Sequence, residues 1–208
     1  MQDRLGLGHI EGKEYRTNGV RPDDIAVIGD SHHSYNMGYW EKHGAFCMAI
    51  RGGGLVHAER AVRSIKSKCF LLLIGGNDVS KMGGEGMLDR MGDVVSELTR
   101  RHDTEIVITG SLIPRAGKEK LVREMQFANG YMNKVHTKHH HFMFTTFQTN
   151  NTIRDELYIR DGTHLNEYGL KVHRQILDWV VGCVNLRAFE GQMELEVNGG
   201  GDAVWWEF

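Results

Sequence analysis

Short apolar runs rich in β-branched residues alternate along this chain with longer stretches in which apolar residues recur every three or four positions. The short runs predict five strands, at 25–28, 45–50, 70–74, 105–109 and 142–147. The longer stretches predict helices at 33–43, 55–67, 86–101, 118–137 and 167–184. Because strands alternate with helices and several strands are continuously apolar, the pattern predicts a parallel sheet covered by helices on both faces.

The length of 208 residues suits one well-cored domain, which we expect at residues 21–186 after a polar N-terminal arm at 1–20. In the remaining segment, 187–208, two apolar stretches flank a glycine-rich sequence, which predicts a hairpin. We interpret this hairpin as packed on the edge of the domain rather than as a flap over a substrate.

Composition narrows the classes of partner and compartment. The net charge is only -2, so no overall field attracts nucleic acid or an anionic membrane. No stretch approaches the ~20 apolar residues of a membrane span, and no signal peptide is visible, so we expect a cytoplasmic protein. The cysteines, Cys47, Cys69 and Cys183, lie among apolar neighbours and are interpreted as buried hydrophobic residues in a reducing compartment.

Four motifs stand where predicted strands end or where the last predicted helix begins: 29–31 (Gly-Asp-Ser), 52–54 (three glycines), 75–78 (Gly-Gly-Asn-Asp) and 161–164 (Asp-Gly-Thr-His). In a parallel sheet, the carboxyl ends of the strands meet at one edge, where ligands bind. Ser31, Gly53 and Asn77 are therefore expected at one rim, which the loop before the last helix can also reach.

These residue types form a complete set for acyl transfer. A serine hydroxyl needs a base within hydrogen-bond reach, and the developing negative charge needs hydrogen-bond donors. We assign Ser31 as nucleophile, His164 as base and Asp161 as the carboxylate that orients the imidazole. The amides of Ser31 and Gly53 and the side chain of Asn77 are the expected oxyanion donors.

On these motifs the chain resembles the SGNH hydrolase superfamily, or GDSL esterases and lipases, whose four blocks carry serine, glycine, asparagine and Asp-x-x-His in this order. The resemblance covers about residues 24–184. It is strongest toward esterase domains of LINE-type retrotransposons, through 157–166, and toward platelet-activating-factor acetylhydrolase-like members, through 110–115. It implies a flavodoxin-like three-layer α/β/α sandwich with a five-stranded parallel sheet in the order 2-1-3-4-5, and an esterase that uses neither metal nor cofactor.

Two blocks depart from the family pattern. His32 and His33 follow the serine where family members more often carry Leu, Met or Ile. The second block is three consecutive glycines, so Gly54 stays open as an alternative to Gly53 for the oxyanion donor.

The sequence thus predicts a serine esterase that hydrolyses short-chain or acetyl carboxylic esters, of small molecules or lipids, through an acyl-enzyme. The alternative is a catalytically silent module of the same fold that binds RNA or protein, although the charge does not favour nucleic acid. A phosphate binder using 52–54 lacks a P-loop pattern. The histidines at 136 and 139–141 have no partners at a metal-ligating spacing and are interpreted as a solvated helix end.

Overall fold

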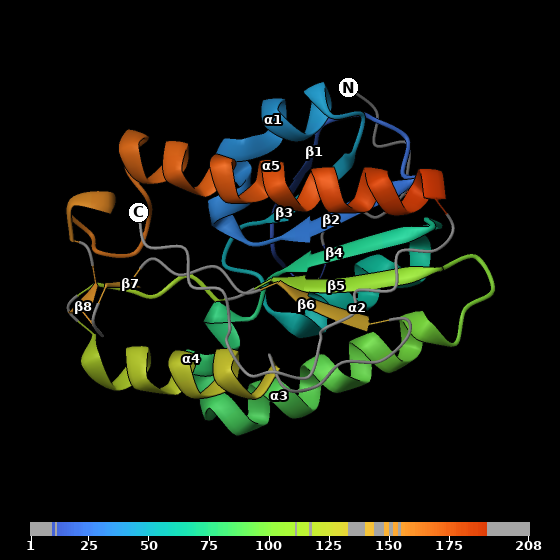
Figure 1. The fold of residues 1–208 in the computed structure, drawn as a ribbon. Helices are drawn as coiled ribbons and strands as arrows, with labels where there is room; N and C mark the ends of the chain where they lie inside the picture. The colour runs from blue at the N-terminus through green and yellow to red at the C-terminus, as the bar shows by residue number, and fades with distance from the viewer. Residues whose placement is uncertain are drawn as a thin grey trace, which may run out of the picture.

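The computed structural model describes residues 10, 12–110, 112–116, 118–132, 140–143, 148–149, 152–153 and 155–190. A six-stranded sheet forms the middle layer (Figure 1). Its strands lie in the order β1 (Tyr15–Thr17), β3 (Phe46–Ile50), β2 (Ile25–Gly29), β4 (Cys69–Leu73), β5 (Ile106–Gly110) and β6 (His140–Met143). A separate two-stranded sheet pairs β7 (Gln148–Thr149) with β8 (Thr152–Ile153).

The sheet is mixed rather than purely parallel, so that part of the prediction was wrong. Strands β2 to β6 pair in parallel, whereas β1 pairs antiparallel with β3 at the edge. The observed order differs from the expected 2-1-3-4-5 by this added edge strand. Three residues, Tyr-Arg-Thr, are too few to show a period. Backbone pairing, with Tyr15 opposite Ile50, and packing of Tyr15 against the core bring them from the expected arm into the sheet.

The helices follow the strands as expected in type, with different limits. They are η1 (Ser31–Asn36, a 3₁₀ helix), α1 (Met37–Lys42), α2 (Leu55–Ser64), α3 (Gly76–Thr99), α4 (Glu119–Met132), η2 (Asp155–Leu157, 3₁₀) and α5 (Glu167–Glu190). Helix α3 begins earlier than its apolar pattern predicts and is kinked at Gly83, whose φ is 76°. Glycine adopts this positive φ without strain. The glycine that permits the kink also interrupts the apolar pattern, although the helix continues through it.

Two layers of helices cover the sheet: α1 and α5 lie on one face, and α2, α3 and α4 on the other (Figure 1). Alternate residues of a strand enter opposite cores. In β2, Ala26 and Ile28 pack into the core under α2 and α3, whereas Val27 packs with Trp40 and Leu177 under α1 and α5. Burial on both faces explains the continuously apolar strands.

Some sequence predictions meet the structure only in part. Cys47 and Cys69 are buried, as expected. His140 and His141 lie in β6, so their interpretation as a helix end was wrong: backbone pairing with Val107 and Ile108 of β5 places them in the sheet. The expected C-terminal segment, 187–208, begins inside α5, which continues to Glu190, and its predicted hairpin at 193–208 lies outside the described residues. The histidines at 136 and 139 lie outside them as well. Within the described ranges, every helix is too short or too polar to cross a membrane.

Candidate active site

Ser31 is the first residue of η1, directly beyond the carboxyl end of β2. The turn is tight, because a Cβ on Gly29 would lie 2.6 Å from the side chain of His33. Asp30 caps η1, since its Oδ1 accepts the backbone N–H of His32 at 3.0 Å. Together these contacts fix where the Ser31 hydroxyl stands.

The structure brings Ser31, His164 and Asp161 into one hydrogen-bonded chain. Ser31 Oγ lies 3.1 Å from His164 Nε2, although the two residues are 133 positions apart. His164 Nδ1 lies 2.6 Å from Asp161 Oδ2. The other carboxylate oxygen, Oδ1, accepts the backbone N–H groups of Thr163 at 2.7 Å and His164 at 2.9 Å. The loop before α5 thus holds its own carboxylate against the imidazole.

The charge state of Asp161 determines the direction of these hydrogen bonds. Its hydrogen bond with the His164 side chain, helped by the two backbone N–H groups, lowers the pKa of Asp161 to about 2. At neutral pH it is therefore a carboxylate, which can only accept. His164 Nδ1 then carries the hydrogen, and in the neutral ring Nε2 is left as an acceptor facing Ser31 Oγ.

Asn77 is held by both ends of its side-chain amide. Its Nδ2 donates to the Gly53 carbonyl oxygen at 2.8 Å, and its Oδ1 accepts from Arg115 Nη2 at 2.6 Å. An amide nitrogen carries two hydrogens, so one N–H of Asn77 remains for a ligand.

Gly53 meets the site through its carbonyl, not through the free amide expected from the sequence. Its N–H donates to the Ile50 carbonyl at 3.0 Å, and the N–H of the alternative, Gly54, donates to His57 Nδ1 at 3.1 Å. Both positions need glycine: a Cβ would lie 2.5 Å from Ile50 Cγ2 at Gly53, and 2.5 Å from Asp78 Oδ1 at Gly54. The glycine block therefore shapes the turn that orients Asn77.

The sequence did not assign a role to His32 or Arg115. The structure places His32 against the Thr163 carbonyl and Arg115 against the Asn77 side chain. Arg115 comes from the loop after β5 and fixes the Asn77 amide. The His32 ring connects Asp30 with the Thr163 carbonyl. The close spacing of Asp30 and His32 was a sequence signal for their contact. The sequence holds no signal for the bond to the Thr163 carbonyl, which is 131 positions away.

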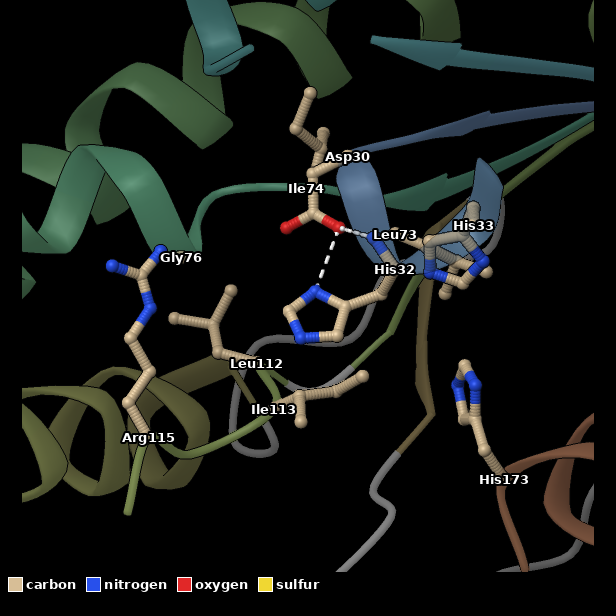
Figure 2. Close-up of a pocket in the computed structure, with 10 residues that line it drawn as sticks. All are labelled: Asp30, His32, His33, Leu73, Ile74, Gly76, Leu112, Ile113, Arg115 and His173. Atoms are coloured by element: carbon tan, nitrogen blue, oxygen red, sulfur yellow. Dashed lines mark hydrogen bonds and ion pairs between the residues drawn. The ribbon is translucent and has the colours of Figure 1, made fainter. Parts of the chain in front are cut away.

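Two hollows flank the site. A small cavity of about 20 Å³ lies beside the serine turn, lined by His32, His33, His173 and Arg115 among others (Figure 2). An open groove of about 360 Å³ borders His164, and its walls combine apolar and charged side chains: Tyr35, Ile159, Leu165, Leu170, Glu167 and Arg174. In the described part of the chain, no three His, Cys, Asp or Glu residues are arranged to hold a metal ion.

His33 and His173 are buried neutral histidines, and they predict a loss of stability in mild acid. Burial lowers the pKa of His33 to about 4 and that of His173 well below its ordinary 6.5. The unfolded chain therefore takes up protons between pH 6.5 and 4 that the folded protein does not. The free energy of unfolding should fall as pH drops through this window, by about 1.4 kcal/mol per pH unit for each histidine.

Urea unfolding at pH 6.5 and pH 4.5 measures this effect, and His173→Leu should reduce the difference between the two pH values by about half. His32 does not oppose this loss of stability. The pKa of His32 is raised above 6.5, so its contribution to the free energy of unfolding changes only above pH 6.5. Equal stability at the two pH values would show that the buried rings are already protonated in the fold.

Comparison with known proteins gives the class of fold. No protein-family model and no curated protein match the sequence. Among solved structures, a Streptococcus pneumoniae protein provisionally assigned as a platelet activating factor is 18% identical, with 85% of this chain and 88% of that chain covered and a TM-score of 0.66. A provisionally assigned acylhydrolase from Bacteroides fragilis is 15% identical, with coverage of 88% and 99% and a TM-score of 0.64.

The catalytic domain of the peptidoglycan O-acetyltransferase OatA from Streptococcus pneumoniae is 13% identical, with coverage of 80% and 96% and a TM-score of 0.62. A GDSL-like lipase is a further match. The chain therefore has the fold of the SGNH hydrolases, as the sequence motifs predicted.

Proposed function

We propose that this protein is a serine esterase that hydrolyses carboxylic esters through an acyl-enzyme. The observation that carries the proposal is the hydrogen-bonded chain from Ser31 Oγ through His164 to Asp161. A fold shared with esterases and acylhydrolases supports it. The same three residues, at these distances, have the roles of nucleophile, base and orienting carboxylate.

In the acylation step, Ser31 Oγ attacks the ester carbonyl carbon while His164 Nε2 takes its proton. The carbonyl oxygen becomes an oxyanion that accepts the Ser31 N–H and the second N–H of Asn77 Nδ2. Gly53 contributes by holding the first N–H of Asn77, which fixes the direction of the second. The carbon–oxygen bond to the alcohol then breaks, and His164 returns its proton to the leaving oxygen.

Deacylation uses the same groups with water as nucleophile. His164 takes a proton from the water, whose oxygen attacks the acyl carbon, and returns a proton to Ser31 Oγ as the acid leaves. Asp161 stays ionised throughout, because its pKa lies far below neutral. Its role is to hold the ring tautomer and to stabilise the imidazolium in each transition state.

The groove beside His164 is the proposed site for the alcohol portion of the ester. The base must reach the leaving oxygen to protonate it, so the leaving group lies on the side of His164, where the groove opens. Its apolar walls and Arg174 suit an alcohol with both apolar and polar or anionic parts. For the acyl portion we propose an acetyl or other short chain, supported by the likeness to an O-acetyltransferase.

The direct test is covalent labelling by an ethyl p-nitrophenyl phosphonate, read by intact mass and peptide mapping. The wild type should gain one phosphonyl group on Ser31, and Ser31→Ala none. Ser34→Ala is the matched control, because Ser34 lies in the same 3₁₀ helix and its buried Oγ has no hydrogen-bond partner. Labelling of Ser31→Ala, or of neither protein, would contradict the esterase. Relative rates on p-nitrophenyl acetate, butyrate and octanoate then measure the acyl preference.

A further inference from the structure

The His32 side chain lies between the segment that carries the nucleophile and the loop that carries the base. Its Nδ1 is 3.0 Å from Asp30 Oδ1, and its Nε2 is 2.7 Å from the carbonyl oxygen of Thr163, 131 positions away. The residue is only 4% exposed. Figure 2 shows the ring turned toward the Asp30 carboxylate, with a dashed line joining them. Neither contact belongs to the Ser31, His164 and Asp161 chain.

The two partners define which hydrogens the ring carries. A carbonyl oxygen can only accept, so His32 Nε2 must be an N–H. Asp30 Oδ1 already accepts the backbone N–H of His32, as a carboxylate does, so Nδ1 is also an N–H. A ring with both N–H groups is an imidazolium, and it forms a buried ion pair with Asp30.

The electrostatic surroundings agree with this ion pair. Burial alone would raise the pKa of Asp30 and lower that of His32, but their mutual charge and hydrogen bond reverse both directions. The other charged or titratable groups that act on the pair come from η1, the loop after β5, the loop before α5 and α5 itself: His33, Arg115, His164 and His173. None of these is a carboxylate, so Asp30 is the counter-ion of His32.

The contact with Thr163 matters because of where Thr163 lies. It directly precedes His164 and follows Asp161 by two positions, and both of those side chains are substantially exposed, at 29% and 44%. The loop is also held at Gly162, whose carbonyl oxygen accepts the Ala116 N–H at 2.7 Å, but that bond leads to the segment after β5 and not to Ser31. The charge-assisted bond from His32 therefore joins this loop to the Ser31 segment at a point one residue from the base.

We propose that His32, paired with Asp30, is a positioning residue that holds the Thr163 carbonyl and thereby keeps His164 in hydrogen-bond reach of Ser31. The proposal rests on the proposed esterase function. Pairing with Asp30 also means that His32 adds no net positive charge beside the base: the His32 and His164 ring centroids are 5.5 Å apart, and an unpaired imidazolium there would oppose the charge that His164 gains in each step.

The first experiment compares kinetics of His32→Leu with those of His173→Leu. His32→Leu should lower kcat for p-nitrophenyl acetate by about 10–100-fold, because a displacement of about 1 Å at the reacting atoms has that effect, with KM nearly unchanged. The phosphonylation rate of Ser31 should fall by a similar factor. His173 is equally buried, at 4%, and its Nδ1 lies 3.3 Å from Asn36 Nδ2 in η1, so its variant should keep the wild-type kcat.

His32→Leu leaves the Asp30 carboxylate buried without its cation, which can unfold the protein. The double variant Asp30→Asn, His32→Leu removes that charge and still lacks the bond to Thr163. It should fold and retain the low kcat. A folded single or double variant with wild-type kcat and wild-type phosphonylation rate would overturn the proposal.

A spectroscopic measurement tests the bond without using activity. In protein labelled with ¹⁵N-histidine, one ring should show both nitrogens protonated at pH 7.5, and this signal should be absent from His32→Leu. A neutral His32 ring would overturn the proposal even in an active enzyme. Failure of the esterase appears differently, as absence of Ser31 labelling in the wild type with the imidazolium signal still present.

Discussion

Replacement of Ser31 by alanine is expected to lower kcat for ester hydrolysis by about 10⁴-fold or more. The substitution removes the hydroxyl oxygen that stands 3.1 Å from His164 Nε2, so no acyl-enzyme can form on residue 31. Residual hydrolysis would come from water activated by His164 with the same oxyanion donors. Initial rates with p-nitrophenyl acetate, normalised to folded protein, measure the loss.

The matched comparison is the double variant Ser31→Ala, His164→Ala. Because nucleophile and base act in one step, the double variant should be no slower than the slower single variant. Ser34→Ala should retain the wild-type rate. Losses that multiply in the double variant would contradict a shared step and would place His164 in a different part of the reaction.

The parts of the fold that the sequence predicted are those with a local signal. The strands β2 to β5 are continuously apolar because helices bury both faces, and the motif at the end of each strand is polar or glycine-rich. Strand β1 carried no such signal, because three residues cannot show a period and its pairing depends on backbone groups. The first half of α3 was missed because glycines, including Gly83 with its positive φ, interrupt the apolar pattern.

The residues of the site also fall into those with a local sequence signal and those without one. Ser31, Asp161 and His164 were predicted by residue type and by position at a strand end or before the last helix, and the structure joins them in one hydrogen-bonded chain. Asn77, predicted in the same way, is hydrogen-bonded to Gly53. The Gly53 amide was expected to be an oxyanion donor, but it donates to the Ile50 carbonyl, and residue types do not encode such a backbone bond. A backbone amide or carbonyl is present at nearly every position, so its partner cannot be inferred from composition or spacing.

The junction between the base loop and α5 should be the most sensitive backbone position near the site. Gly169 lies in the first turn of α5, and a Cβ there would lie 2.1 Å from the Leu157 carbonyl oxygen. That oxygen accepts the Asn166 N–H at 2.9 Å, and the Asn166 side chain accepts the Gly169 N–H at 2.9 Å. A methyl group must therefore separate the start of the helix from residue 157 and strain both bonds.

Gly169→Ala is accordingly expected to lower the free energy of unfolding by about 3 kcal/mol, since the clashing atom is backbone and cannot rotate away. The displaced segment, 157–166, contains Asp161 and His164, so kcat should fall as well in the protein that remains folded. Gly182→Ala is the matched control. Gly182 lies in the same helix, and beyond that helix no atom of the described residues lies within 4 Å of an added Cβ, so the substitution should stabilise the protein by about 0.5–1 kcal/mol. Urea unfolding and turnover of both variants measure these effects. Equal stability and equal turnover in the two variants would mean that the start of α5 is not held against residue 157, and that the loop carrying Asp161 and His164 takes its position from its other contacts, with Ala116 and with the serine segment.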